Sequence, residues 1–344
     1  MIGNIQVLRF VAALMVALYH IQLPVARGEL TILSLFERGS VGVDIFFVIS
    51  GVVIYLVSAS KDKLLIGEFA SKRFWRIYPP YIAVLCLAVL IACMQSAIGG
   101  TSQTYNALSI ESLTVSALLL PLSPQIYPIA WTLTLEIVFY GIFCLAFRAG
   151  GIRGVIFALL AWYMAAKTYS LYLHDPDGPM IWFLHSVVLE FLFGVVIGIL
   201  YQRNAVIFAP LAALAGVAGV VLVLTTERIG LGREIEFGLP AALLVYGAVG
   251  LRWRVPSFGL LAGESSYILY LIHPLLFSIT AVAAARALGV DIYASEAAML
   301  LTVAGLVATA MALTVWVERP YIAWYKSRMV GAPRQTKVAA SGTF

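Results

Sequence analysis

The chain has 344 residues, of which 62% are hydrophobic and 11% are charged, and its formal net charge is +5. A soluble globular domain usually has about 25% charged residues, and a disordered chain is poor in apolar ones. Here the apolar residues form long runs, which is the pattern of membrane helices. The composition therefore excludes both of those classes and favours an integral membrane protein.

Ten segments, taken in chain order, are apolar and long enough to be membrane helices, because a helix needs about 20 mostly apolar residues to cross the hydrocarbon core. We therefore predict an all-α, polytopic transmembrane bundle of about ten helices. The apolar stretch 113–120 is too short to span, and we expect an interfacial or re-entrant piece there. The ten predicted segments are 5–23, 41–59, 78–98, 130–147, 152–173, 183–201, 206–225, 235–251, 264–285 and 295–317.

The positions of the basic residues predict the orientation of the bundle. If the N-terminus is inside, 15 of the 22 Lys and Arg residues lie in cytoplasmic segments. The outer loops then contain only Arg27, Arg38, Arg228, Arg233 and, at a segment end, Arg286. The positive-inside rule therefore predicts that both termini are cytoplasmic. We expect residues 1–330 to form the transmembrane domain and 331–344 to be a disordered cytoplasmic tail.

Arg9 and His20 are the first candidates for chemistry, because an ionisable residue inside a bilayer is costly and by default marks a functional site. They are eleven residues apart in the first segment. At about 100° and 1.5 Å per residue they share a face and lie about 16 Å apart along the axis, so they can contact two ends of one elongated ligand but not each other. Alternatively, Arg9 reaches the inner headgroups and His20 is a satisfied polar residue near the interface.

Two acidic residues follow at the outer ends of later segments. Asp44 lies at a depth similar to that of His20 and is a candidate to fix the imidazole tautomer, with a pairing to Arg38 or a helix N-terminal position as the alternatives. Glu136 lies about one turn into the fourth segment, with Tyr140 at i+4 on the same face. We expect Glu136 to meet His20, an arginine or a substrate hydroxyl. We count both acids among the candidate catalytic residues.

Arg73 and Arg76 come just before the third segment, on the predicted inner side. Being three residues apart, they share a helical face. Forked guanidinium groups suit phosphates, so we expect this pair to anchor the phosphates of a nucleotide-bearing donor. Ordinary positive-inside charge is the alternative.

The ninth predicted segment contains a histidine next to a proline. His273 lies near mid-membrane on the same face as Tyr270, and Pro274 leaves the Tyr270 carbonyl without its helical donor. A hydrogen-bonded structural kink and a substrate site are both consistent with this pattern. We count Tyr270 and His273, together with Trp131 and Tyr140, as candidate substrate-binding residues.

Other kinds of site find no support in the sequence. Cys86, Cys93 and Cys144 lie in apolar runs without CxxC or zinc-ligand spacing, so we expect neither a disulfide nor a bound metal. There is no Gly-rich phosphate loop and no GxSxG elbow, so serine nucleophile chemistry is unsupported. Gly194-x-x-x-Gly198 and Gly259-x-x-x-Gly263 predict close helix packing.

Five motifs follow one another along the chain at these depths. Together they resemble the membrane-bound acyltransferase-3 family, specifically its members that modify bacterial exopolysaccharides, over essentially the full length. This chain departs from the family pattern at Thr132, where serine is usual, and at Ile137, where a second acid is common. The motifs are Arg9-x10-His20, Gly42-Val43-Asp44-Ile45-Phe46-Phe47-Val48-Ile49-Ser50-Gly51, Arg73-x-x-Arg76, Trp131-Thr132-Leu133-x-x-Glu136 and Ser266-Tyr267-x-Leu269-Tyr270-Leu271-Ile272-His273.

The resemblance implies ten core helices in the bacterial cytoplasmic (inner) membrane. It also implies transfer of an acyl group, usually acetyl, from cytoplasmic acyl-CoA to a sugar hydroxyl of an exopolysaccharide or lipid-linked glycan. It further implies that Arg9, His20, Arg73 and Arg76 are essential. We expect acyl-CoA, the glycan and membrane lipids as partners, and no nucleic acid.

Residues and resemblance combine into one mechanistic hypothesis. The donor phosphates would bind Arg73 and Arg76, and the pantetheine arm would pass Arg9, which holds the donor or polarises the thioester. His20 would act as general base on the acceptor hydroxyl, oriented by Asp44 or Glu136. An acyl-histidine intermediate is compatible with this scheme but not required by it.

Two other classes compete with this hypothesis. A transporter or flippase of lipid-linked sugars typically has broken helices in both of two repeated halves, and Pro274 has no counterpart in the first half. A polysaccharide polymerase or ligase would be expected to have a large, Arg-rich outer loop, and the loop 99–129 contains no Lys or Arg. Both patterns favour the acyltransferase.

Overall fold

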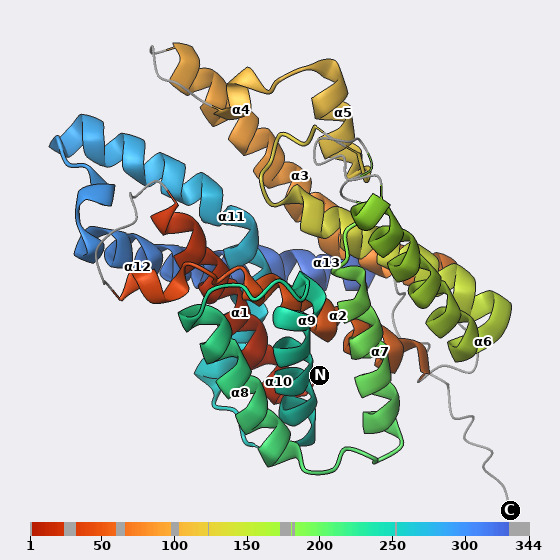
Figure 1. Cartoon of the computed structure of the whole chain (residues 1–344). Helices are drawn as coiled ribbons and strands as arrows, with labels where there is room; N and C mark the ends of the chain where they lie inside the picture. The colour runs from red at the N-terminus through yellow and green to blue at the C-terminus, as the bar shows by residue number, and fades with distance from the viewer. Residues whose placement is uncertain are drawn as a thin grey trace, which may run out of the picture.

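The computed structural model describes residues 2–23, 32–59, 66–97, 103–122, 124–172, 180, 183–251 and 253–329. Within these residues every regular element is a helix, which confirms the predicted all-α fold (Figure 1). The predicted tail, 331–344, lies outside the described residues. The elements are α1 (Gly3–Gln22), η1 (Leu33–Phe36), α2 (Val41–Ala59), α3 (Ile66–Ala97), α4 (Gln103–Asn106), α5 (Ile110–Leu118), α6 (Ala130–Tyr172), α7 (Val188–Gln202), α8 (Ala209–Thr225), α9 (Arg233–Glu236), α10 (Gly238–Gly250), α11 (Ser257–Leu288), η2 (Ile292–Ala294), α12 (Glu296–Leu313), η3 (Thr314–Glu318) and α13 (Arg319–Met329).

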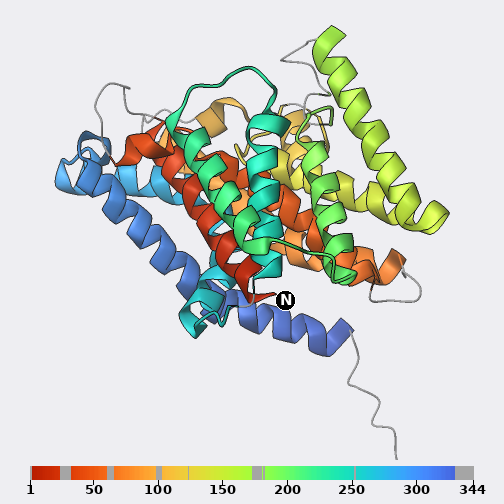
Figure 2. The same cartoon turned by 60° about the horizontal axis from the view of Figure 1, so that its bottom comes forward.

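In the described part of the chain, six helical stretches are long and apolar enough to cross a membrane: α1, α2, α3, α6, α11 and the stretch Glu296–Arg328. The predicted segments 130–147 and 152–173 are the two arms of α6. The backbone leaves the helical conformation at Gly150 and Gly151, and Gly151 has a φ of 58°, which favours glycine. Figure 2 shows the two arms leaving this corner in different directions.

Very close contacts hold α1, α2 and α7 together at positions without a side chain. A Cβ added at Gly42 of α2 would lie 2.2 Å from the Ala12 carbonyl oxygen of α1, and one at Gly194 of α7 would lie 2.0 Å from the Val48 carbonyl oxygen of α2. Gly263 of α11 approaches Gln6 of α1 in the same way, at 2.4 Å. The close packing predicted at Gly194 and Gly263 is confirmed, and α1 packs closely against both α2 and α11.

The predicted start of the third segment, at residue 78, is wrong. Helix α3 begins at Ile66 and continues through Pro79 and Pro80, so Arg73 and Arg76 lie inside the helix and not before it. Proline has no N–H, and Pro79 leaves the Trp75 carbonyl without its helical donor. The Tyr321 hydroxyl of α13 donates to that carbonyl at 2.8 Å. This tertiary hydrogen bond therefore replaces the missing helical one, and the local sequence does not predict it.

The last predicted segment, 295–317, corresponds to α12 together with η3. Helix α12 runs into the π turn η3, and α13 continues to Met329. Pro320 is the second residue of α13, in its first turn, where a missing N–H is tolerated. Figure 2 shows α13 at the same end of the bundle as the N-terminus.

Candidate active site

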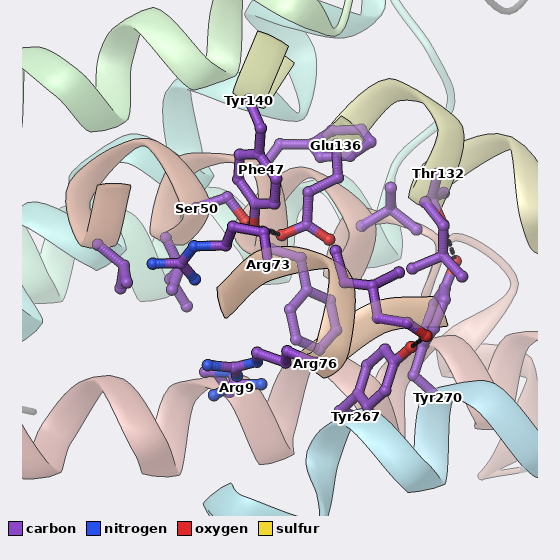
Figure 3. A pocket seen from close by; sticks show the side chains of 16 residues that line it. Arg9, Phe47, Ser50, Arg73, Arg76, Thr132, Glu136, Tyr140, Tyr267 and Tyr270 are labelled. Carbon is purple, nitrogen blue, oxygen red and sulfur yellow. Dashed lines mark hydrogen bonds between the residues drawn. The ribbon is translucent and has the colours of Figure 1, made fainter. Parts of the chain in front are cut away.

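A cavity that is partly open to solvent lies between α1, α2, α3, α6 and α11. Figure 3 shows three guanidinium groups on one side of it and two tyrosine rings on the other. The cavity brings together six residues predicted from the sequence, namely Arg9, Arg73, Arg76, Glu136, Tyr140 and Tyr270. We refer to it below as the arginine cavity.

The three arginines of the cavity share one property. Among the residues that the structure describes, none of them forms an ion pair with a carboxylate. Arg9 lines the cavity and has one long hydrogen bond, 3.4 Å from its Nη1 to Oε1 of Gln6. The Arg73 guanidinium lies over the rings of Phe69 and Tyr140, at 5.6 and 5.4 Å from their centroids. Three cations without a paired anion make this cavity suited to a ligand with several negative charges.

Glu136 is the carboxylate that lines the arginine cavity, and its partners are hydroxyl groups. Ser50 donates a hydrogen bond of 2.9 Å to Oε1 of Glu136, and the Tyr140 hydroxyl donates to the same oxygen. The predicted position of Tyr140 on the same helical face as Glu136 is confirmed. Both bonds fix the carboxylate on the wall of the cavity between α2 and α6.

His20 and His273 do not line the arginine cavity; they lie next to each other. Their ring centroids are 4.8 Å apart. Nδ1 of His20 is 2.9 Å from the Val16 carbonyl oxygen, and Nδ1 of His273 is 2.7 Å from the Tyr270 carbonyl oxygen that Pro274 leaves free. A carbonyl only accepts, so each Nδ1 carries the proton and each Nε2 is the basic nitrogen of a neutral ring. Nε2 of His273 is buried and has no partner among the described residues.

Tyr270 lies between these two places. It lines the arginine cavity, and its ring centroid is 5.7 Å from that of His273. Its hydroxyl shares a hydrogen bond of 2.7 Å with Thr132, which fixes the ring between α6 and α11. Tyr270 therefore contacts both the arginine cavity and the histidine pair, which makes the two places neighbours.

Asp44 is fully buried but is engaged elsewhere. Arg233 of α9 donates to both of its carboxylate oxygens, at 3.0 and 2.7 Å. The predicted contacts of Asp44 with His20 or Arg38 are therefore replaced by an ion pair with Arg233. A similar depth did not mean a similar direction, because Asp44 faces α7 and α9 and His20 faces α11. No carboxylate of the described residues contacts the His20 ring.

Trp131 is also outside the arginine cavity. Its ring stacks on His185, with centroids 5.5 Å apart, and meets Phe47 edge-on at 6.4 Å. Phe47 does line the cavity. Trp131 therefore packs against a residue of the cavity wall without lining the cavity itself. Its predicted contact with substrate stays a prediction.

Comparison with known proteins identifies the family of the chain. Residues 2–319 match the family described as "Acyltransferase domain". The chain belongs to this family. It is also 29% identical over 329 residues to the exopolysaccharide production protein ExoZ of Rhizobium meliloti (strain 1021), covering 86% of this chain and 94% of that protein. No solved structure is significantly similar to the chain.

Three neutral residues of this acyltransferase complete the site and were not among the predicted site residues. Ser50 and Thr132 bind Glu136 and Tyr270, and Tyr267 lines the cavity while its hydroxyl donates to the Ile77 carbonyl at 2.9 Å. They lie inside the five motifs, but the search for costly charges in the membrane did not select neutral hydroxyl groups.

Proposed function

We propose that this protein is a membrane O-acyltransferase that moves an acyl group, in the first instance acetyl, from acyl-CoA to a hydroxyl of a bacterial exopolysaccharide or its lipid-linked precursor. The observation that carries the proposal is the arginine cavity, with three arginines and no paired carboxylate among the described residues. The name of the similar protein ExoZ supports the acceptor class. The predicted location is the bacterial inner membrane.

The donor would bind with its phosphate groups in the arginine cavity. Arg73 and Arg76 present forked donors to phosphate oxygens, and Arg9 faces the same space from α1. The pantetheine arm would then extend along α1 past Tyr270, toward the histidines. Glu136 would offset part of the positive charge of the cavity, and its two hydroxyl partners fix it in place.

The acceptor would meet the donor at the histidine pair. His20, held by the Val16 carbonyl, presents Nε2 as a base for the acceptor hydroxyl. The hydroxyl oxygen attacks the thioester carbon, the C–O ester bond forms, and the C–S bond breaks. The proton passes from the hydroxyl to Nε2 of His20 and then to the departing sulfur of CoA. His273, with its unpartnered Nε2 beside the His20 ring, would orient the acceptor hydroxyl or the protonated His20.

Purified protein incubated with labelled acetyl-CoA and candidate glycans tests this function. We expect labelled ester on the glycan, and at least about a hundredfold loss in His20→Ala and Arg9→Ala, since a general base contributes about 10²–10⁴-fold. Arg148→Ala is the matched control, because Arg148 is exposed and does not line the cavity. Full activity of His20→Ala or of Arg9→Ala would refute the mechanism. Transport of a lipid-linked sugar without ester formation would favour the flippase.

Binding of CoA in detergent tests the donor site separately. We expect Arg73→Ala and Arg76→Ala each to weaken CoA binding at least about tenfold, because a hydrogen bond to a charged group contributes about 1.5–3 kcal/mol. Unchanged affinity in the double variant would refute the phosphate role of these arginines.

A further inference from the structure

A groove with an almost entirely apolar surface lies between α3 and the first arm of α6. Its lining residues recur every three or four positions, within 66–78 of α3 and 137–145 of α6, so each helix contributes one continuous face. Both helices are long and apolar enough to cross a membrane. Of the lining side chains, Phe74 is 48% exposed and Leu145 is 67% exposed. We call this feature the lateral groove, and its position on two spanning helices directs it toward lipid chains and not toward water.

Arg73 connects the lateral groove with the arginine cavity. Arg73, Ile77 and Tyr140 line both spaces, and Figure 3 shows Arg73 and Tyr140 at the arginine cavity. Among the described residues that line the groove, Arg73 is the only charged one. Its Nε is buried and has no hydrogen-bond partner in the described part of the chain. A cation beside apolar surface is costly unless an anion meets it, so the place where the two spaces join favours an anionic group.

Gly141 leaves part of the lateral groove unfilled. At Gly42 and Gly194 an added Cβ would lie 2.2 and 2.0 Å from a backbone oxygen of another helix, so the missing side chain serves helix packing there. Gly141 is exposed, and a Cβ added to it would meet no heavy atom of the described residues within 4 Å. Packing between the described helices therefore does not account for this glycine. A ligand chain that lies in the groove would be able to approach the α6 backbone closely at this position.

We propose that the lateral groove binds a hydrocarbon chain of a membrane phospholipid, and that the phosphate of the same lipid contacts Arg73. The two apolar helical faces fit the chain, and the guanidinium group without an ion-pair partner fits the phosphate. A free anion would leave the groove empty, and an uncharged hydrocarbon would leave Arg73 unpaired. A phospholipid carries both groups in one molecule. The inference concerns a lipid and not the acyl donor, so it does not rest on the proposed function.

Lipid binding by the full-length protein in a mild detergent tests the proposal. Native mass spectrometry counts the retained phospholipids, and after their removal we measure rebinding of phosphatidylglycerol and of a diacylglycerol with the same chains. We expect the wild type to retain phospholipid. We expect it to bind phosphatidylglycerol at least about tenfold more tightly than diacylglycerol, which is the lower end for a hydrogen bond to a charged group. Arg73→Gln should abolish this difference, and Gly141→Leu, which places a side chain in the groove, should remove the retained lipid.

Gly305→Leu is the matched control. Gly305 is an exposed glycine of a spanning helix, a Cβ added to it also meets no described atom within 4 Å, and it does not line the groove, so this variant should retain lipid like the wild type. Equal lipid retention by Gly141→Leu and Gly305→Leu would overturn the proposal, and so would a wild type that neither retains phospholipid nor rebinds phosphatidylglycerol. Equal affinity of the wild type for phosphatidylglycerol and diacylglycerol would overturn the phosphate contact. If Gly141→Leu does not fold, the comparison of the wild type with Arg73→Gln decides.

Discussion

The substitution Arg233→Gln tests whether the ion pair between Asp44 and Arg233 stabilises the fold or takes part in acyl transfer. Arg233 donates to both oxygens of Asp44, at 3.0 and 2.7 Å, and to the Ser40 carbonyl at 3.1 Å. Asp44 is fully buried, and so is Glu190, whose carboxyl group lies next to it. Removing the cation leaves two buried acids side by side. Removing one partner of a buried pair costs about 3–5 kcal/mol, so we expect a loss of that size in the free energy of unfolding.

Unfolding in detergent is monitored by tryptophan fluorescence, and acyl transfer is measured per folded molecule. Arg228→Gln is the matched control, because Arg228 pairs with Glu236 at 3.3 Å and is 54% exposed, where an ion pair contributes about 0–1 kcal/mol. Adding Asp44→Asn to Arg233→Gln should recover part of the stability, since it removes a carboxylate that lost its partner. A loss below about 1 kcal/mol in Arg233→Gln would refute the structural role. Normal stability with lost activity would instead return Asp44 to the catalytic site.

Two further predictions concern single contacts. Tyr140→Phe removes the hydroxyl that donates to Glu136. Since a hydrogen bond to a charged group contributes about 1.5–3 kcal/mol, we expect kcat to fall about 10- to 150-fold while the fold is unchanged. A wild-type kcat in this variant would contradict the prediction. Burial alone would raise the pKa of Glu234, but hydrogen bonds, chiefly from Lys167 at 2.6 Å, lower it. Its contribution to stability is therefore present above about pH 4.3 and lost as the pH falls toward the lowered pKa of the folded state. Lys167→Met should have a smaller loss of Tm in that acid range, and an identical pH dependence would refute the contact.

The helices were predictable because apolar length is a property of the sequence itself. The second segment has the predicted bounds, and the two arms of α6 meet within the predicted gap. The errors lie where a contact with another helix decides the boundary. Pro79 is accommodated within α3 because the Tyr321 hydroxyl donates to the Trp75 carbonyl. The sequence around Pro79 does not predict this hydrogen bond, because Tyr321 lies far along the chain.

The site was predictable in part for the same reason. Arg9 was selected by the cost of charge in a membrane, and Arg73 and Arg76 by their shared helical face and the fit of guanidinium groups to phosphates. The structure gathers all three around one cavity. The partners of His20 and Asp44 were not predictable, because depth along a helix follows from residue number but the rotation of one helix against another does not. Arg233 was counted as an outer-loop charge, and only the folded position of α9 brings it to Asp44.

The proposed mechanism, in which the donor phosphates and the transferred acyl group bind at different places, would explain why the arginine and the histidine of α1 are three turns apart. If both were in one cavity, the phosphate site and the transfer site would coincide, and a charged donor would need to enter whole. Here the arginine cavity can keep the charged part of the donor, and only its neutral arm needs to pass Tyr270 toward His20 and His273. Moving a neutral thioester through apolar surroundings avoids the desolvation of phosphates, which is the larger cost. The spacing along α1 therefore matches the separation that a donor with a charged end and a reactive end requires.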